Sequence, residues 1–127
     1  MITITPIEQV GEDERGATFV FDNDRHGQFI VAHRKAGSAS GRHYHKGVSP
    51  NKNPEKLILM QGTIEVNWRN IEGALREGAQ ETGSITGSGP ALVVIPAGVW
   101  HEVMAVTDFV MLELNALAEG QGDTYKL

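Results

Sequence analysis

The sequence contains no cysteine, few aromatic side chains and no excess of basic residues. Without cysteine, disulfides, thiolate metal sites and cysteine nucleophiles are excluded. Lysine and arginine total 11 against 16 aspartate and glutamate, which leaves a net charge of −5. Because binding of a phosphate backbone depends on clustered positive charge, this balance argues against a nucleic-acid partner. The side chains left for metal binding or acid–base chemistry are the five histidines and the carboxylates.

Long apolar runs are also missing. No run approaches the roughly 18–20 residues that a membrane span requires. The first residues carry neither the basic region nor the long apolar region of a secretion signal. We therefore expect no membrane partner and a cytoplasmic protein. The length of 127 residues suits one domain over residues 1–127.

Apolar residues alternate mainly with a period of two, which is typical of strands. Glycines at five positions between residues 71 and 90 argue against a helix there, so we expect a short strand and loops. The tail, 116–127, is expected to be irregular or to form a strand exchanged with a partner. About eight to ten short strands without a helix predict an all-β sandwich or barrel. The expected strands are 17–21, 28–35, 42–46, 55–60, 63–69, 91–95, 101–106 and 109–115.

The most specific chemical motif is His43-Tyr44-His45. On a strand, residues i and i+2 face the same way about 6.6 Å apart, so two imidazoles can converge on one ion. Glu55 and His101 each begin a later strand on an apolar face. Three imidazoles and one carboxylate suit a divalent transition metal such as Fe, Zn, Mn or Ni. A His-x-His pair on a strand also occurs in proteins that bind no metal. The spacing of this pair from other residues must therefore indicate whether a metal site is present.

That spacing resembles the first signature motif of the cupin superfamily. Five residues lie between Gly37 and His43, one between His43 and His45, and six between Glu55 and Gly62. The sequence departs from the motif in one place, because nine residues separate His45 from Glu55 where three or four are usual. We interpret residues 46–54 as an inserted loop.

A second group of residues resembles the second cupin motif. It consists of Pro96, Gly98 and His101, with one residue between the first two and two residues between the last two. The resemblance implies a small β-barrel, or jelly roll, of two antiparallel sheets, with one metal ion in its interior. Ligands of that ion would be His43, His45, Glu55 and His101. The family also leads us to expect a homodimer with edge strands paired between subunits.

The string 41–46 is similar to single-domain or C-terminal cupins of surface-polysaccharide biosynthesis, which act on nucleotide-sugar keto intermediates as ketoisomerases or epimerases. This similarity implies a small-molecule substrate and an isomerase or epimerase reaction. The candidate bases that remove a proton are His33 and Glu113, and the candidate substrate-binding cations are Arg34 and Arg42. Two alternatives stay open: a non-haem metal-dependent dioxygenase and a non-catalytic module that binds a small ligand.

Overall fold

The structure, a computed structural model, describes residues 1–71 and 82–127. Among these residues, eleven strands and one short helix follow one another along the chain. No helix in these two ranges is long and apolar enough to cross a bilayer. The elements are β1 Thr3–Pro6, β2 Glu8–Asp13, β3 Gly16–Val20, β4 Ile30–Arg34, β5 Ala39–His43, β6 Glu55–Gln61, β7 Thr63–Asn70, β8 Thr82–Ser88, β9 Ala91–Ile95, β10 Val99–Ala105, β11 Phe109–Glu113 and α1 Leu117–Gln121.

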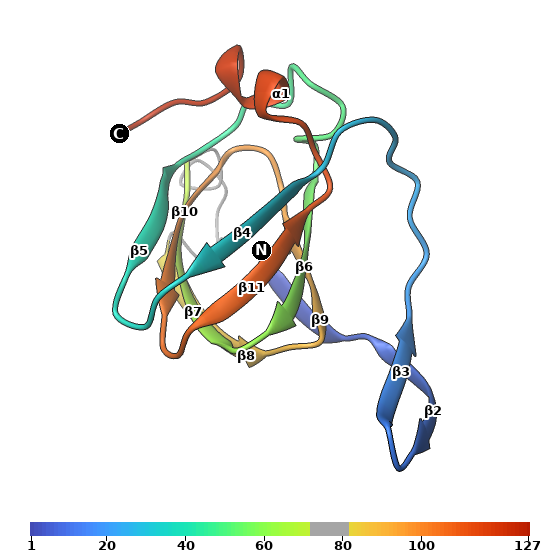
Figure 1. Ribbon diagram of the computed structural model, residues 1–127. Coiled ribbons are helices and arrows are strands. Elements are labelled where there is room, and N and C mark those ends of the chain that lie inside the picture. The colour runs from blue at the N-terminus through green and yellow to red at the C-terminus, as the bar shows by residue number, and fades with distance from the viewer. Residues whose placement is uncertain (72–81) are drawn as a thin grey trace.

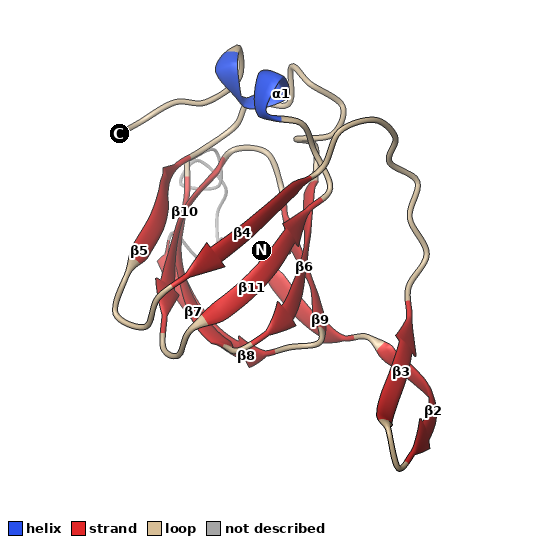
Figure 2. Ribbon diagram, in the orientation of Figure 1, coloured by secondary structure: helices blue, strands red, loops and turns tan. Residues whose placement is uncertain are grey.

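Two antiparallel sheets form the barrel (Figures 1 and 2). One has five strands in the order β1-β9-β6-β11-β4, and the other has four in the order β5-β10-β7-β8. Successive side chains on a strand point to opposite faces, so the period-two pattern places every second residue between the sheets. The predicted all-β, cupin-type barrel of two antiparallel sheets is therefore confirmed.

The core lies between these sheets. Its fully buried side chains include Leu59 on β6, Ile64 on β7 and Val93 on β9. Burying each side chain of this kind stabilises the fold by about 1.5–3 kcal/mol. On β10, burial alternates strictly along the strand, and His101 occupies one of the buried positions among apolar ones. The same alternation that builds the core therefore carries a histidine into the barrel.

Gly62, the turn glycine of the first motif, joins β6 to β7. Its backbone has φ of +96°, a left-handed conformation that glycine adopts without a steric penalty. A Cβ at this position would overlap the Asp108 carbonyl oxygen and the Phe109 backbone. Close packing of the β10–β11 turn against this site therefore requires glycine.

One expectation about local structure needs correction, and another is confirmed in part. The predicted strand 42–46 ends early, because β5 stops at His43 after two residues with positive φ, Gly41 at +84° and Arg42 at +62°. In the glycine-rich interval the expected short strand is confirmed, because residues 82–88 form β8, while residues 72–81 lie outside the described part of the chain.

The C-terminal tail contains a short helix, α1, which the sequence did not predict. After α1 the chain continues as an irregular segment that runs past the end of β5 to the C-terminus (Figure 1), and this segment pairs with its own chain. Tyr125 and Tyr44 exchange two backbone hydrogen bonds of 2.9 Å each, and their rings stack with centroids 5.5 Å apart. This segment is held by pairing between two residues that lie 81 positions apart in the chain, which is why the local sequence did not predict it.

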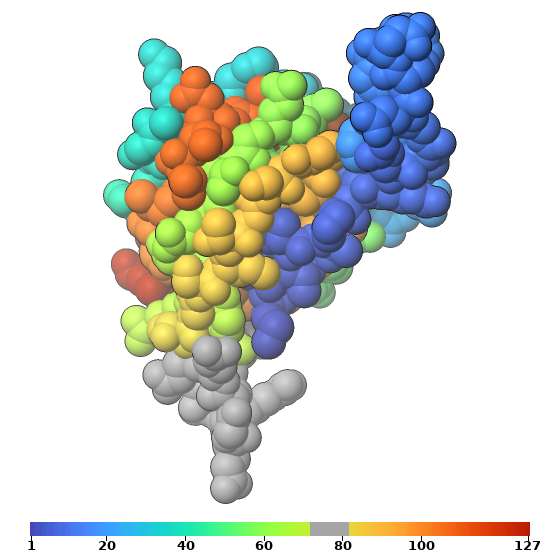
Figure 3. Space-filling model, turned by 90° about the horizontal axis from the view of Figure 1, so that it is seen from below, coloured from blue at the N-terminus to red at the C-terminus, as the bar shows by residue number. Residues whose placement is uncertain are grey.

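The hairpin of β2 and β3 projects away from the barrel (Figures 1 and 3). Every residue of both strands is exposed. Three apolar side chains, Val10, Phe19 and Val20, are among them. An isolated two-stranded hairpin is at best marginally stable in water.

Candidate active site

An extra residue in β5 determines which way the first histidine faces. His43 pairs with His101, and the register shifts at this point so that Arg42 has no residue opposite it. Such a bulge re-aims the side chains that follow it. In a regular strand with Ser40 facing the barrel, Arg42 would also face inward and His43 outward. The bulge therefore places the imidazole of His43 on the inner face, where a regular strand would place the guanidinium of Arg42.

Three imidazoles gather inside the barrel. The ring centroid of His43 lies 4.8 Å from that of His45 and 4.9 Å from that of His101. Their ligand nitrogens all lie within 4.8 Å of one another, so this group could hold a metal ion. Nitrogens that share a tetrahedral ion at about 2.0–2.1 Å are about 3.4 Å apart. The rings would therefore move inward by up to about an ångström to bind one ion together.

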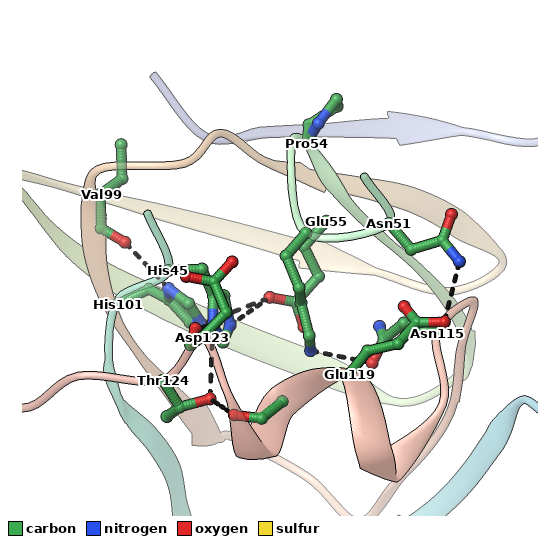
Figure 4. Close-up of polar contacts among 12 residues, drawn as sticks. His45, Asn51, Pro54, Glu55, Val99, His101, Asn115, Glu119, Asp123 and Thr124 are labelled. Atoms are coloured by element: carbon green, nitrogen blue, oxygen red, sulfur yellow. Dashed lines mark hydrogen bonds and ion pairs between the residues drawn. The ribbon is translucent and has the colours of Figure 1, made fainter. Parts of the chain in front are cut away.

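Glu55 faces this cluster despite the long loop before it. In Figure 4 its side chain turns toward His45 and His101. The distance from Glu55 Oε2 is 2.9 Å to His45 Nε2 and 4.0 Å to His101 Nε2. All three side chains are almost completely buried. The inserted loop thus leaves the carboxylate beside the histidines.

Buried Arg25 holds the end of that loop in place. Its guanidinium donates hydrogen bonds of 2.7 Å to the backbone carbonyls of Asn51 and Pro54. Pro54 immediately precedes Glu55, so these bonds fix the point where β6 begins. Nothing in the sequence marked Arg25, because a single arginine after a turn is normally solvated.

Backbone carbonyls determine which ring nitrogens face Glu55. The Nδ1 of His45 lies 2.5 Å from the carbonyl oxygen of Asp123, and the Nδ1 of His101 lies 3.1 Å from that of Val99. Because a carbonyl only accepts hydrogen bonds, each Nδ1 must carry the proton and donate it. In a neutral ring, Nε2 is then left with a free lone pair directed toward Glu55.

This arrangement places two acceptors against each other. Neither His45 Nε2 nor Glu55 Oε2 has a hydrogen-bond partner among the described residues, although they are 2.9 Å apart. A lone pair and a carboxylate at this distance require a cation between them, either a proton on Nε2 or a metal ion. Metal-ligating histidines usually donate the other ring N–H to a carbonyl or carboxylate, as both rings do here. The donor set therefore fits a divalent ion.

The electrostatics keep Glu55 charged and favour the neutral forms of His43 and His101. Burial alone would raise the pKa of Glu55, but the two facing histidines and buried Lys52 outweigh it and lower that pKa to about 2. Burial, followed by the neighbouring histidines, lowers the pKa of His43 to about 4. Burial also lowers the pKa of His101. Neutral imidazole is the form that binds metals and accepts protons.

Lys52 is a functional candidate that sequence reasoning missed. Its ammonium group lies 2.8 Å from Asn115 Oδ1 and 3.6 Å from Glu55 Oε1, and its side chain is only 7% exposed. A buried ammonium costs several kcal/mol unless it is paired. The surrounding segment, 47–54, is rich in turn residues and predicts a solvated loop, so no local signal could have identified the lysine.

A cavity of about 180 Å³ opens beside the cluster. This volume corresponds to about six water molecules, which suits a compact part of a small molecule. Glu113 lies in the wall of this cavity. Its pKa is raised mainly by burial and further by the negative charge of Glu55. The polar side chains in the lining are Arg34, Ser40, His43, Glu55, His101 and Glu113.

Of the four residues predicted for catalysis or substrate binding, two do not reach this cavity. On β4 the register pairs Ala32 with Met111 and Arg34 with Phe109, so these residues face inward. His33 therefore faces outward and is exposed. His33, the other candidate base, therefore lies outside the cavity. Val31, on the same face of this edge strand, is apolar but 60% exposed, so the apolar pattern of β4 does not identify its inward face.

Arg42 is the second exception. Its side chain is 63% exposed, and its Nε donates to Glu102 Oε2 at 2.8 Å on the outside of β10. As the bulge residue, Arg42 is turned away from the interior. Of the two arginines predicted to bind substrate, the structure brings only Arg34 to the cavity.

No protein-family model matches the sequence, and no curated protein matches it either. Solved structures do resemble it. The sugar 3,4-ketoisomerase QdtA from Thermoanaerobacterium thermosaccharolyticum, solved with TDP, is 17% identical at a TM-score of 0.71, covering 99% of this chain and 88% of that one. The dTDP-4-dehydrorhamnose 3,5-epimerase from Sulfolobus tokodaii is 15% identical at a TM-score of 0.63, covering 87% and 74%.

A third neighbour is larger. The capsular polysaccharide assembling protein CapF from Staphylococcus aureus is 28% identical at a TM-score of 0.59 over 96% of this chain. The match covers 34% of CapF, so this chain spans about a third of that protein. Together these likenesses show that the chain has the cupin-type fold of solved nucleotide-sugar isomerases and epimerases.

Proposed function

We propose that this protein modifies a carbohydrate, and that it isomerises or epimerises a keto sugar linked to a nucleotide. The observation that carries the proposal is the cavity inside the barrel, which is lined by Glu113, Arg34 and two histidines of the cluster, His43 and His101. The fold supports it as well, since the neighbours named for their activity are a sugar ketoisomerase and a sugar epimerase.

The cavity offers the groups that this reaction needs. A base removes the proton from the carbon beside the sugar carbonyl, and the bonding electrons move onto the carbonyl oxygen to give an enediolate. Protonation of the former carbonyl carbon, together with transfer of the neighbouring hydroxyl proton to the enolate oxygen, moves the carbonyl to the neighbouring carbon. Return of the proton to the opposite face of the carbon that lost it inverts that carbon instead. Neither outcome needs an external oxidant. Glu113 is our candidate base, because a raised pKa strengthens a carboxylate as a proton acceptor.

Arg34 is the candidate for the charged part of the substrate. It lies at the cavity and also lines a second depression on the outer surface near Lys35. Among the described residues, its guanidinium donates hydrogen bonds to two uncharged oxygens, Ser40 Oγ at 3.2 Å and the His33 carbonyl at 3.1 Å. A guanidinium without a carboxylate partner in these contacts is suited to a diphosphate.

We also propose that His43, His45 and His101, with Glu55 Oε2, hold one divalent metal ion. Support comes from the clustered nitrogens and from the two facing acceptors without hydrogen bonds. A bound divalent ion polarises a carbonyl oxygen and stabilises the charge of an enediolate. Elemental analysis of protein purified without chelators tests the site. Loss of the metal in His43→Asn is expected, and metal-free wild-type protein would contradict the proposal.

Proton exchange tests the enzymatic proposal. The purified protein is incubated with TDP-4-keto-6-deoxyglucose, a ligand seen in a structure of the QdtA enzyme, in D₂O. We expect deuterium at a carbon beside the carbonyl, and a loss of this exchange in Glu113→Gln. The matched control is His33→Asn, whose side chain lies outside the cavity. Exchange unaffected by Glu113→Gln would remove Glu113 from the mechanism.

Two results would favour other functions. Oxygen consumption with bound iron and a diketone or catechol, without sugar exchange, would favour the dioxygenase. Binding of the nucleotide sugar without exchange or any new product would favour a ligand-binding module. Either result contradicts the isomerase proposal.

The exposed hairpin supports a further proposal, that the chain forms a homodimer. Phe19 and Phe21 line a surface depression of about 680 Å³ at the hairpin root, together with Met60 and Pro90. A second copy that covers this apolar surface would stabilise a hairpin that stands alone in the monomer. Light scattering should give twice the monomer mass for wild type and a lower mass for the double variant F19S/F21S. A monomeric wild type would contradict the dimer.

A further inference from the structure

The C-terminal segment reaches the histidine cluster through one residue, Asp123. This side chain is only 1% exposed, and Figure 4 shows it beside His45. Its carboxylate accepts four backbone hydrogen bonds: Oδ1 from Lys46 N at 2.8 Å, and Oδ2 from Gly47, Val48 and Ser49 N at 3.0, 2.8 and 3.3 Å. These four groups belong to the residues that directly follow His45.

The carbonyl of the same residue meets the His45 ring. It accepts the Nδ1 proton at 2.5 Å, while the Asp123 carboxylate binds the backbone just beyond that histidine. On the other side of His45 in the chain, Tyr44 is paired with Tyr125 through two backbone hydrogen bonds. The tail therefore fixes the backbone before His45, the backbone after it, and the ring itself.

We infer that Asp123 is a positioning residue, which holds His45 in the Nδ1–H form and thereby presents its Nε2 to Glu55. A ring without this constraint could carry the proton on either nitrogen, and rotation about its side-chain bonds would move Nε2 away. The hydrogen bond at one imidazole nitrogen determines what the other can bind. This inference deepens the proposed function, because it concerns the same cluster.

The chain supplies a matched pair of isosteric variants. Asp123→Asn turns an amide group that donates hydrogen bonds toward N–H groups that need an acceptor, which weakens the clamp with little change in volume. Glu119→Gln makes the same carboxylate-to-amide change on α1. Glu119 connects the same tail to the same loop by accepting hydrogen bonds from Ser49 Oγ at 3.3 Å and Asn51 Nδ2 at 3.0 Å, and within the described part of the chain it makes no hydrogen bond or ion pair with His45.

The test is ¹⁵N NMR of histidine-labelled, metal-free protein, followed by titration with zinc alone. We expect a proton on His45 Nδ1 in wild type and Glu119→Gln, and a mixture of the two neutral forms in Asp123→Asn. Loss of such a supporting contact typically weakens metal binding about 10–100-fold, so zinc affinity should fall in that range for Asp123→Asn and stay within about twofold for Glu119→Gln.

Two results would overturn the inference. One is a wild-type His45 without a proton on Nδ1, which can be observed even if the variant does not fold. The other is a folded Asp123→Asn whose His45 signals and zinc affinity match those of wild type. Neither measurement involves a sugar. A failure here is therefore distinct from a failure of the isomerase proposal, which is judged by proton exchange.

Discussion

Lys52 and Glu55 form a buried ion pair, with Nζ and Oε1 3.6 Å apart and both side chains less than a tenth exposed. The inserted loop supplies the lysine, and the next strand supplies the carboxylate. Removing one member of a buried pair leaves the other charge without compensation, which typically costs about 3–5 kcal/mol. The inserted loop is therefore part of the site, because it supplies the cation that pairs with Glu55.

A lysine substitution tests this relationship. Lys52→Met should lower the free energy of unfolding by about 3 kcal/mol in metal-free protein, because Glu55 and Asn115 both lose their cationic partner. The matched control is Lys56→Met, whose partner Asp24 is largely exposed and whose loss should cost less than about 1 kcal/mol. Urea unfolding measures both. Equal losses in the free energy of unfolding would show that the buried Lys52 pair stabilises the protein no more than the exposed Lys56 pair does.

Stability of the metal-free protein should fall in mild acid. The pKa of His43 is lowered from 6.5 to about 4, and that of His101 is also lowered. Between pH 6.5 and 4 the unfolded chain therefore binds more protons than the folded one, so the free energy of unfolding decreases as pH falls through this range. Urea midpoints at pH 7 and pH 4.5 should show a smaller decrease in His43→Asn than in wild type.

The control for this pH dependence is His26→Asn, since His26 is exposed and should leave the decrease unchanged. The same decrease in His43→Asn as in wild type would assign the acid sensitivity to other groups.

Glu113 should leave a signature in the pH dependence of catalysis. Its pKa is raised by burial and by Glu55, so the rate should decline toward acid at a pH above 4.5, the ordinary value for glutamate. Glu113→Gln should lower kcat by about 10²–10⁴-fold, as is typical for removal of a general base. Glu102→Gln, on the outer side of β10, is the control and should retain kcat. An acid limb that persists unchanged in a residual activity of Glu113→Gln would contradict this role.

Gly62 should tolerate no side chain. A residue other than glycine in a left-handed conformation costs about 1–2 kcal/mol, and the added Cβ would also overlap the Asp108 carbonyl. Gly27→Ala separates the two effects, because Gly27 also has positive φ, +92°, but has open space around it. We expect thermal unfolding to show a much larger loss for Gly62→Ala than for Gly27→Ala. Similar losses would mean that the turn can move to accommodate a methyl group.

Much of the fold was predictable from local pattern. Alternating apolar residues indicated most of the strands of the barrel, and the absence of cysteine restricted any metal site to imidazoles and carboxylates. The motif spacings selected His43, His45, Glu55 and His101, and the structure brings these four side chains together. The strands are readable because side chains alternate between the two faces of a regular strand, whereas the four ligand candidates were selected by the resemblance to the cupin motifs.

What the sequence determined by itself was thus the set of candidate ligands and the kind of barrel that carries them. Only the tertiary structure decided that Arg42 bulges outward, that His33 faces solvent, and that Lys52 and Asp123 are buried at the cluster. The first two depend on register between strands, and the last two on contacts between segments far apart in the chain. Strand pairing and burial arise when distant segments meet, so a local pattern of residues cannot encode which charged side chains they enclose.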